Sequence, residues 1–96
     1  MQFMIEFKMP KNFTEEMSAL IPEQRAIVDE LLAENLILSY TLSFSKHKLW
    51  VVIDAETEAD AFDIIAELPL TKYMKIDIHP LMFHDSADMV YTFSAN

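Results

Sequence analysis

Three stretches of the chain alternate apolar and polar side chains with the period of two that is typical of a half-buried strand. They lie at residues 2–9, 38–44 and 73–79, and a fourth stretch, residues 49–53, is a short apolar run of the kind found in a buried strand. A proline ends the first stretch, and two prolines bracket the stretch at residues 73–79. The pattern therefore predicts four strands.

The segment between the first two strands predicts a helix in two parts. Asn12 and Glu15 resemble a capping box, and Thr14 is a competing cap, so a helix begins at this point. Apolar side chains then recur at helical spacing to about Glu34. Pro22 lies inside this span and lacks the N–H that a helix interior needs. We therefore expect a short first turn followed by the main helix.

A second helix is expected between the third and fourth strands. Thr57 and Asp60 suit its start, and it must end at Leu68 because Pro69 disfavours helical angles there. The predicted order is βαββαβ, the ferredoxin-like arrangement, an α+β fold in which two helices cover one face of an antiparallel sheet. The hairpin has no glycine, which favours a four-residue type I loop over a tight primed turn.

The chain is expected to form a single domain over residues 1–96, because no linker or internal repeat divides it. Within it, residues 1–84 are the core and residues 85–96 a C-terminal arm. The run Met89 to Phe93 in this arm is β-prone and predicts an extra C-terminal strand. Such a strand would dock on its own sheet edge or on a neighbouring subunit, and we favour the neighbour.

Charge and composition exclude several classes of protein. Sixteen acidic residues against seven basic ones give a net charge of −9, so neither nucleic acid nor an anionic membrane surface is an expected partner. The chain has no cysteine, which excludes disulfides and thiolate chemistry. It begins without a basic leader and has no long apolar run, so a cytoplasmic protein is expected.

The apolar content is high for such a short chain. Of its 96 residues 52% are apolar, which favours an oligomer interface or an apolar pocket. Trp50, Val52 and Met4 would lie on the sheet face that the helices leave uncovered. Pairing two such sheets would bury them, so we expect a homodimer or a larger homo-oligomer.

The stretch that the prolines bracket carries a family resemblance. Its Leu-Pro-Leu at residues 68–70, its Tyr-Met-Lys-Ile at residues 73–76, and the acid, apolar residue and Pro-Leu that follow resemble the C-terminal signature of the muconolactone isomerase family. His84 and Ser86 also match positions of that family. The resemblance covers roughly residues 12–86 and is strongest in the last third.

The resemblance implies a small ferredoxin-like subunit that assembles as a dimeric α/β-barrel type homo-oligomer. It also implies a cofactor-free proton shift in an unsaturated lactone from aromatic-compound catabolism. The chain departs from the family at Thr41-Leu42-Ser43 and Ser45-Lys46, where members commonly have Trp-Arg and Gly-Glu.

The polar side chains that could carry chemistry belong to the sheet face away from the helices. By subtraction this face holds Glu6, Lys8, Ser39, Thr41, Ser43, Trp50, Val52, Lys75, Asp77 and His79. The first and last strands of a ferredoxin-like sheet are neighbours, so Glu6 can lie beside Asp77 or His79. A proton shift next to a carbonyl needs a base and a donor for the developing enolate, and we name these three residues as catalytic candidates.

A further five residues are candidates for binding a small cyclic organic ligand: Ser39, Thr41, Trp50, Lys75 and His84. The competing interpretation is that the same face is a polar interface between subunits. A metal site could be formed by His79, His84 and either Asp77 or Asp85, but no tight ligand spacing supports one. We therefore expect neither a metal nor a cofactor.

The leading hypothesis is an isomerase that transposes a C=C bond in a small lactone. The alternatives are a non-catalytic small-molecule-binding or structural homo-oligomer on the same fold, and a cofactor-free ferredoxin-like monooxygenase.

Overall fold

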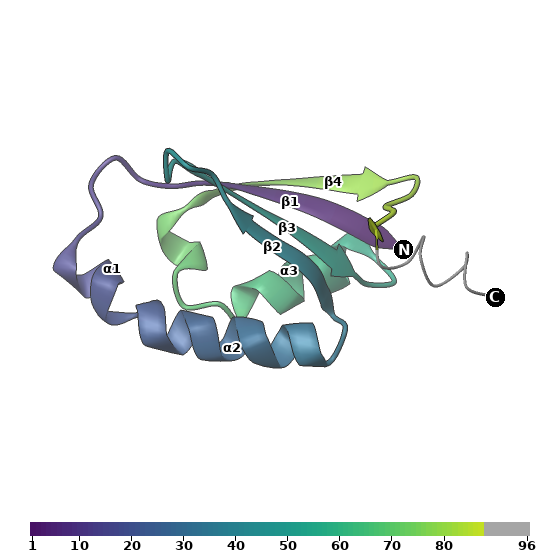
Figure 1. The fold of residues 1–96 in the computed structure, drawn as a ribbon, viewed down its shortest axis with the longest axis horizontal. Coiled ribbons are helices and arrows are strands. Elements are labelled where there is room, and N and C mark those ends of the chain that lie inside the picture. Colours follow the sequence, from purple (N-terminus) through teal and green to yellow (C-terminus); the bar gives the residue numbers. More distant parts are fainter. Residues whose placement is uncertain (88–96) are drawn as a thin grey trace.

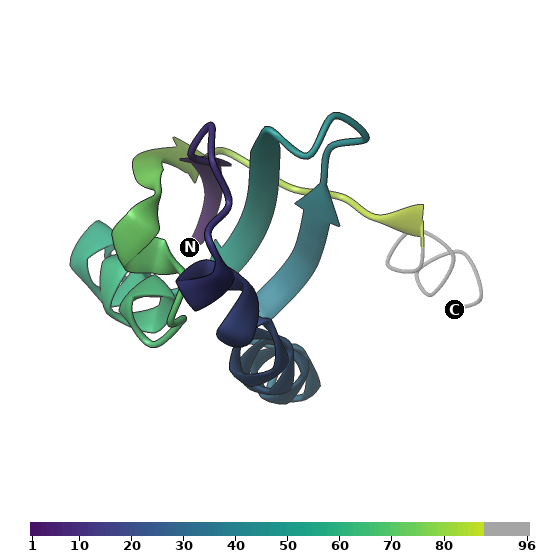
Figure 2. The same cartoon turned by 90° about the vertical axis from the view of Figure 1, so that its left-hand side faces the viewer.

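The computed structural model describes residues 1–87 and shows one antiparallel sheet with helices against one face (Figures 1 and 2). In chain order the elements are β1 (Gln2–Lys8), α1 (Glu15–Ala19), α2 (Ile21–Ala33), β2 (Ile37–Leu42), β3 (Lys48–Asp54), α3 (Glu58–Ala66), the 3-10 turn η1 (Thr71–Tyr73) and β4 (Lys75–Leu81). The strand order is β2-β3-β1-β4, with all neighbours antiparallel. The predicted ferredoxin-like α+β fold is confirmed. The expected extra strand at Met89 to Phe93 lies outside the described residues.

The hydrophobic core lies between the sheet and the helices. Phe3, Ile5 and Phe7 of β1 alternate with polar residues and are at most 2% exposed, as period two requires. They pack with Val28 of α2 and Ile65 of α3 in one cluster. The opposite face carries no helix within residues 1–87, and we call it the open face (Figure 2).

The N-terminal helical segment is divided as the sequence predicts. Thr14, not Asn12, is the N-cap, and its Oγ1 accepts a hydrogen bond of 3.2 Å from the N–H of Met17. Leu20 separates α1 from α2, and Pro22 occupies the first turn of α2, where its missing N–H costs nothing. The proline thus restarts the helix.

The turn from α2 into β2 is closed without glycine. Asn35 adopts a left-handed conformation with φ of 60°, and Leu36 N–H donates back to the carbonyl of Leu31, as in a Schellman motif. The alternation over residues 38–44 predicts that Leu38 begins the core face of this strand. A register shift between Ile37 and Ser39 puts Ile37 into the core in its place.

The last two strands differ from the prediction at their ends. β2 ends at Leu42 and β3 begins at Lys48, so the hairpin loop has five residues, one more than the expected four. Tyr73 lies in η1, and β4 runs on through Pro80, which pairs with Phe3. β4 is an edge strand, and an edge tolerates a proline because one side of its backbone needs no partner.

None of the helices within residues 1–87 has the length and apolar character needed to cross a membrane.

Candidate functional site

The open face is organised in rows of side chains that cross the strands. The register places Thr41, Trp50, Glu6 and Asp77 directly opposite one another on β2, β3, β1 and β4, and we call them the central row. Directly opposed side chains on one face of an antiparallel sheet have Cβ atoms only about 5 Å apart. Two carboxylates, Glu6 and Asp77, are therefore neighbours at the centre of this face.

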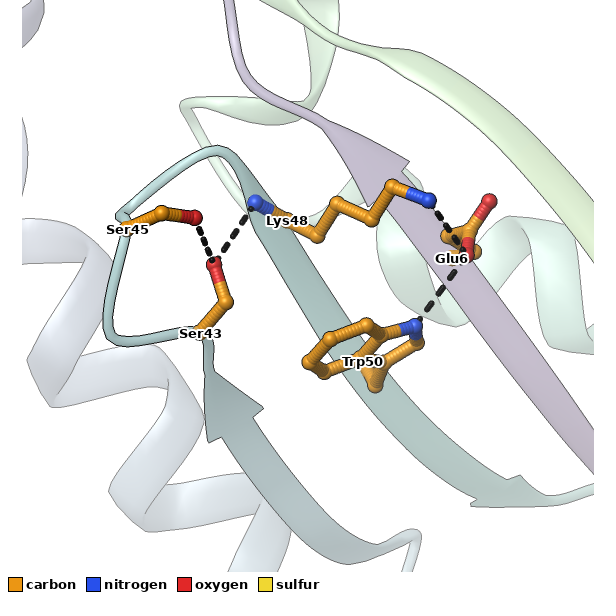
Figure 3. Close-up of polar contacts among 5 residues, drawn as sticks. All are labelled: Glu6, Ser43, Ser45, Lys48 and Trp50. Atoms are coloured by element: carbon orange, nitrogen blue, oxygen red, sulfur yellow. Dashed lines mark hydrogen bonds and ion pairs between the residues drawn. The ribbon is translucent and has the colours of Figure 1, made fainter.

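Glu6 is held by two side chains of β3. Its Oε1 accepts a hydrogen bond of 3.2 Å from Trp50 Nε1 and lies 3.6 Å from Lys48 Nζ (Figure 3). The Trp50 hydrogen bond lowers the pKa of Glu6 below its ordinary value of 4.5, and the positive charges of Lys48 and Lys8 act in the same direction against partial desolvation. Glu6 is thus kept ionised and fixed in orientation.

The hairpin loop positions Lys48 at the start of β3. The backbone N–H of Lys48 donates to Ser43 Oγ at 3.1 Å, and Ser43 Oγ lies 3.1 Å from Ser45 Oγ (Figure 3). Lys46 has φ of 64°, so the turn places a non-glycine residue in the left-handed region. These contacts fix where the strand begins, and therefore which face Lys48 occupies.

Asp77 and His79 lie two residues apart on β4 and share the open face. Both are exposed. His79 lies opposite Met4, which is two residues from Glu6 on β1 and on the same face. The register therefore brings the three catalytic candidates to one area of the sheet. Asp77 is exposed, so its carboxylate faces solvent on this surface.

Of the ligand-binding candidates, Ser39, Thr41, Trp50 and Lys75 lie on the open face, with Ser39 opposite Val52. His84 follows β4 and is not part of the sheet. The expectation that Val52 is exposed is wrong, because it is 1% exposed between Met4 and Ser39.

Two lysines on this face were not among the candidates. Lys8 pairs with Lys48 on one side and with Lys75 on the other. The sequence offered a signal for Lys48, since Lys48, Trp50 and Val52 follow one another at spacing two. Assigning Lys48 to the hairpin loop hid this signal.

A groove of about 200 Å³ lies on the other side of the molecule, beside α2. It is lined by Ile27, Glu30, Leu31, Glu34 and Glu67, none of which belongs to the open face. No group of three or more His, Asp or Glu side chains in residues 1–87 is arranged to hold a metal ion. The chemistry-bearing residues are therefore those of the sheet surface.

Such an arrangement is suited to moving protons on a flat ligand. The central row offers a fixed anion, a second carboxylate beside it and an indole ring, and His79 lies two residues from Asp77. A carboxylate can take a proton from carbon next to a carbonyl, and an imidazole can donate to the enolate oxygen that results.

Comparison with known proteins identifies both a family and a similar fold. Residues 1–87 match the family model described as Muconolactone delta-isomerase. Among solved structures, a crystal structure of muconolactone isomerase superposes with a TM-score of 0.72 at 21% sequence identity, covering 91% of this chain and 94% of that chain. At this identity the structural match concerns the fold alone. No curated protein sequence matches the chain at a significant level.

Proposed function

Because this chain belongs to the muconolactone delta-isomerase family, we propose that it is a cofactor-independent isomerase that moves a proton within a small unsaturated lactone. The observation that carries the proposal is the pairing of Glu6 with Asp77 in the central row, beside Trp50. The pairing supports acid–base chemistry because one carboxylate is held ionised by its neighbours while the other faces solvent.

The proposed reaction balances without any co-reactant. A base removes a proton from a carbon that is conjugated with the lactone carbonyl, the electron pair enters the conjugated system as an enolate, and a proton equivalent returns to another carbon of that system. The C=C bond moves along the ring, and no atom is gained or lost. The protein must supply a base and a donor for the enolate oxygen.

We assign the base to Asp77. The Glu6 carboxylate is already engaged by Trp50 and Lys48, whereas the exposed carboxylate of Asp77 can reach a ligand on this face. In this assignment Glu6 orients the indole of Trp50, against which the ring of the ligand lies. His79 shares the face of β4 with Asp77 and serves as the donor to the enolate oxygen.

Incubation of the pure protein with muconolactone tests the proposal, with substrate loss followed by absorbance and deuterium uptake followed by NMR in heavy water. Asp77→Asn and His79→Ala are each expected to lower turnover by about 10²–10⁴-fold. Two matched controls should retain full activity: Asp63→Asn, at an exposed position of α3, and His47→Ala, in the hairpin loop. A wild-type rate equal to that in buffer would remove the isomerase assignment.

We also propose that the protein works as a homodimer in which two open faces meet. An exposed sheet surface cannot by itself exclude water from a reacting ligand, whereas a second sheet can. Trp50 and Met4 are only half-buried on this face, and Phe44 in the hairpin loop after β2 is fully exposed. Surface of this kind is commonly covered by a partner.

The exposure of the open face also favours a second candidate, a non-catalytic homo-oligomer whose partner sheet fills the same surface. The two candidates differ in what Asp77→Asn does. Loss of turnover with unchanged mass in light scattering supports the isomerase, while loss of mass supports the structural role.

A further inference from the structure

Lys48 and Trp50 contact the same oxygen atom of Glu6. The indole Nε1 of Trp50 donates to Glu6 Oε1 at 3.2 Å, and Lys48 Nζ lies 3.6 Å from that oxygen (Figure 3). Lys48 and Trp50 are two residues apart on β3, and Glu6 lies directly opposite Trp50 on β1. Two side chains of β3 therefore hold one carboxylate oxygen of β1, and we call these three residues the Glu6 clamp.

The charges on either side of Glu6 act in the same direction. On β4 its direct partner is Asp77, whose exposed carboxylate repels it, because like charges directly opposite each other on neighbouring strands are unfavourable. On β3 the ammonium of Lys48 attracts it. The Glu6 side chain is only 23% exposed, so its contacts are screened less than those of a fully exposed pair. Both charges keep the carboxylate on the β3 side, where the indole N–H lies.

The hairpin loop fixes the backbone from which Lys48 reaches Glu6. The Lys48 N–H donates to Ser43 Oγ at 3.1 Å, and the Lys48 carbonyl accepts from the Ser43 N–H at 2.8 Å. Both backbone groups of Lys48 are therefore bonded to one residue at the other end of the loop. Its ammonium approaches Glu6 from a fixed starting point, which makes the ion pair a defined part of the site.

We infer that Lys48 is a positioning residue, which holds the Glu6 carboxylate on the indole N–H of Trp50 and so fixes the flat surface against which the ring of a ligand lies. The inference rests on the proposed function for the ring ligand alone. An indole that is held in place loses less conformational freedom when a ring stacks on it. A ring that binds in one orientation also presents the same carbon to Asp77 each time.

The Glu6 clamp can be tested first without a ligand, through the indole N–H proton of Trp50, the only tryptophan. In Lys48→Met this proton should exchange with water about threefold faster in NMR, because its hydrogen bond to Glu6 is open more of the time. Lys48→Arg should restore the exchange rate to within about twofold of wild type, since a guanidinium can form the same ion pair. Exchange in Lys48→Met at the wild-type rate would overturn the inference.

The second measurement is ring binding. The probe is γ-crotonolactone, an uncharged unsaturated lactone, and quenching of Trp50 fluorescence reports its binding. Lys48→Met is expected to weaken this binding about fivefold, the loss expected for one partly exposed ion pair. A lactone affinity that Lys48→Met leaves unchanged, or no saturable binding to the wild type up to about 50 mM, would refute the role of Lys48 in fixing a ring surface.

Lys8→Met is the matched control, because Lys8 lies directly opposite Lys48 in the register. It influences the pKa of Glu6 by its charge alone, whereas Lys48 also forms a hydrogen bond. Its removal should leave both the indole exchange rate and lactone binding within about twofold of wild type. If Lys8→Met has the same effect as Lys48→Met, overall charge is the cause and the positioning role is wrong.

A double-mutant cycle shows whether Lys48 acts through Glu6. Glu6→Gln keeps an oxygen that can accept from the indole and removes the charge that Lys48 holds. In this background Lys48→Met should change neither exchange nor binding, because the ion pair is already absent. A loss of the same size in both backgrounds would show a general structural role for Lys48 and would contradict the inference.

Neither measurement involves turnover, so the positioning role and the isomerase can fail separately. Exchange and lactone binding that respond to Lys48→Met, in a protein that does not isomerise muconolactone, would keep the positioning role and remove the isomerase. Turnover of muconolactone by the wild type, with an indole proton that is unchanged in Lys48→Met, would keep the isomerase and remove the role of Lys48.

Discussion

Gln24 offers a quantitative test of how the helices are held to the sheet. It lies in the first half of α2, is 4% exposed, and is the only buried polar or charged residue within residues 1–87. Its Nε2 donates to the Tyr40 hydroxyl at 3.1 Å, and its Oε1 accepts from the backbone N–H of Leu70 at 3.2 Å. One amide thus connects α2, β2 and the segment that follows α3.

Replacing Gln24 by Met keeps the length of the side chain and removes both polar groups. The buried Leu70 N–H loses its acceptor, which costs about 1–3 kcal/mol, because an unmade buried hydrogen bond carries its full desolvation penalty. The half-buried Tyr40 hydroxyl loses one donor, worth about 0.5–1.5 kcal/mol, and the methionine recovers part of this sum through its apolar burial. We expect a net loss near 2 kcal/mol.

Urea unfolding followed by Trp50 fluorescence and circular dichroism measures this loss. For a domain of this size a change of about 2 kcal/mol moves the midpoint by roughly 1–2 M at unchanged slope, and the melting temperature falls by about 8–16 °C. All samples must have the same protein concentration, because association adds to apparent stability.

Two further variants act as controls for Gln24. Tyr40→Phe removes only the hydroxyl that Gln24 contacts and should cost about 1 kcal/mol, less than Gln24→Met. Ala26→Met places the same side chain on an exposed position of α2 and should change stability by less than about 0.5 kcal/mol. A Gln24→Met protein as stable as wild type would refute the claim that the Leu70 N–H depends on this amide.

The remaining predictions concern the open face and the helix caps. Trp50→Phe removes the strongest influence on Glu6, so the pKa of Glu6 should rise towards 4.5 in an NMR titration, and no rise would contradict the assigned cause. Because the pKa of Glu6 is lower in the folded state, the stabilisation by Glu6 is fully present above pH 4.5 and is lost as the pH falls through the folded-state pKa. Acid unfolding of the wild type and of Glu6→Gln measures this difference. Trp50→Ala should lower the mass in light scattering, whereas the exposed Phe62→Ala on α3 should not. Thr57→Ala should cost about 1 kcal/mol in urea unfolding, because Thr57 Oγ1 caps α3 by accepting from the Asp60 N–H. Ser18→Ala is the control, because it removes an exposed hydroxyl inside α1 that caps no helix.

The local pattern of the chain was sufficient to predict the elements. Period-two alternation assigned the core face of β1, and Thr57 and the prolines marked where helices begin or end. These features depend on residues close together in the sequence, and their physical cause is local: backbone sterics, capping and the geometry of a pleated strand. Where two local signals competed, as with Asn12 and Thr14, the sequence left the choice open, and the backbone conformation of Thr14 decided it.

Alternation also assigned the catalytic candidates to one face, because a strand offers only two. It could not say which residues lie opposite one another. The pairing of Glu6 with both Trp50 and Asp77 depends on the register of three strands that are far apart in the sequence. A shift of two residues would keep every side chain on its face and still separate the two carboxylates.

The pairing of three lysines on the open face and the contacts of Gln24 have the same origin. Lys8, Lys48 and Lys75 are unremarkable surface lysines in the sequence, and only the register brings them together. Gln24 is of a polar residue type that is usually exposed on a helix. It is buried because α2 packs where the Tyr40 hydroxyl and the Leu70 N–H can satisfy its amide. The sequence determined by itself which elements form and which way their side chains face. Tertiary structure decided which of those side chains meet, because long-range pairing depends on how all four strands and the helices pack together.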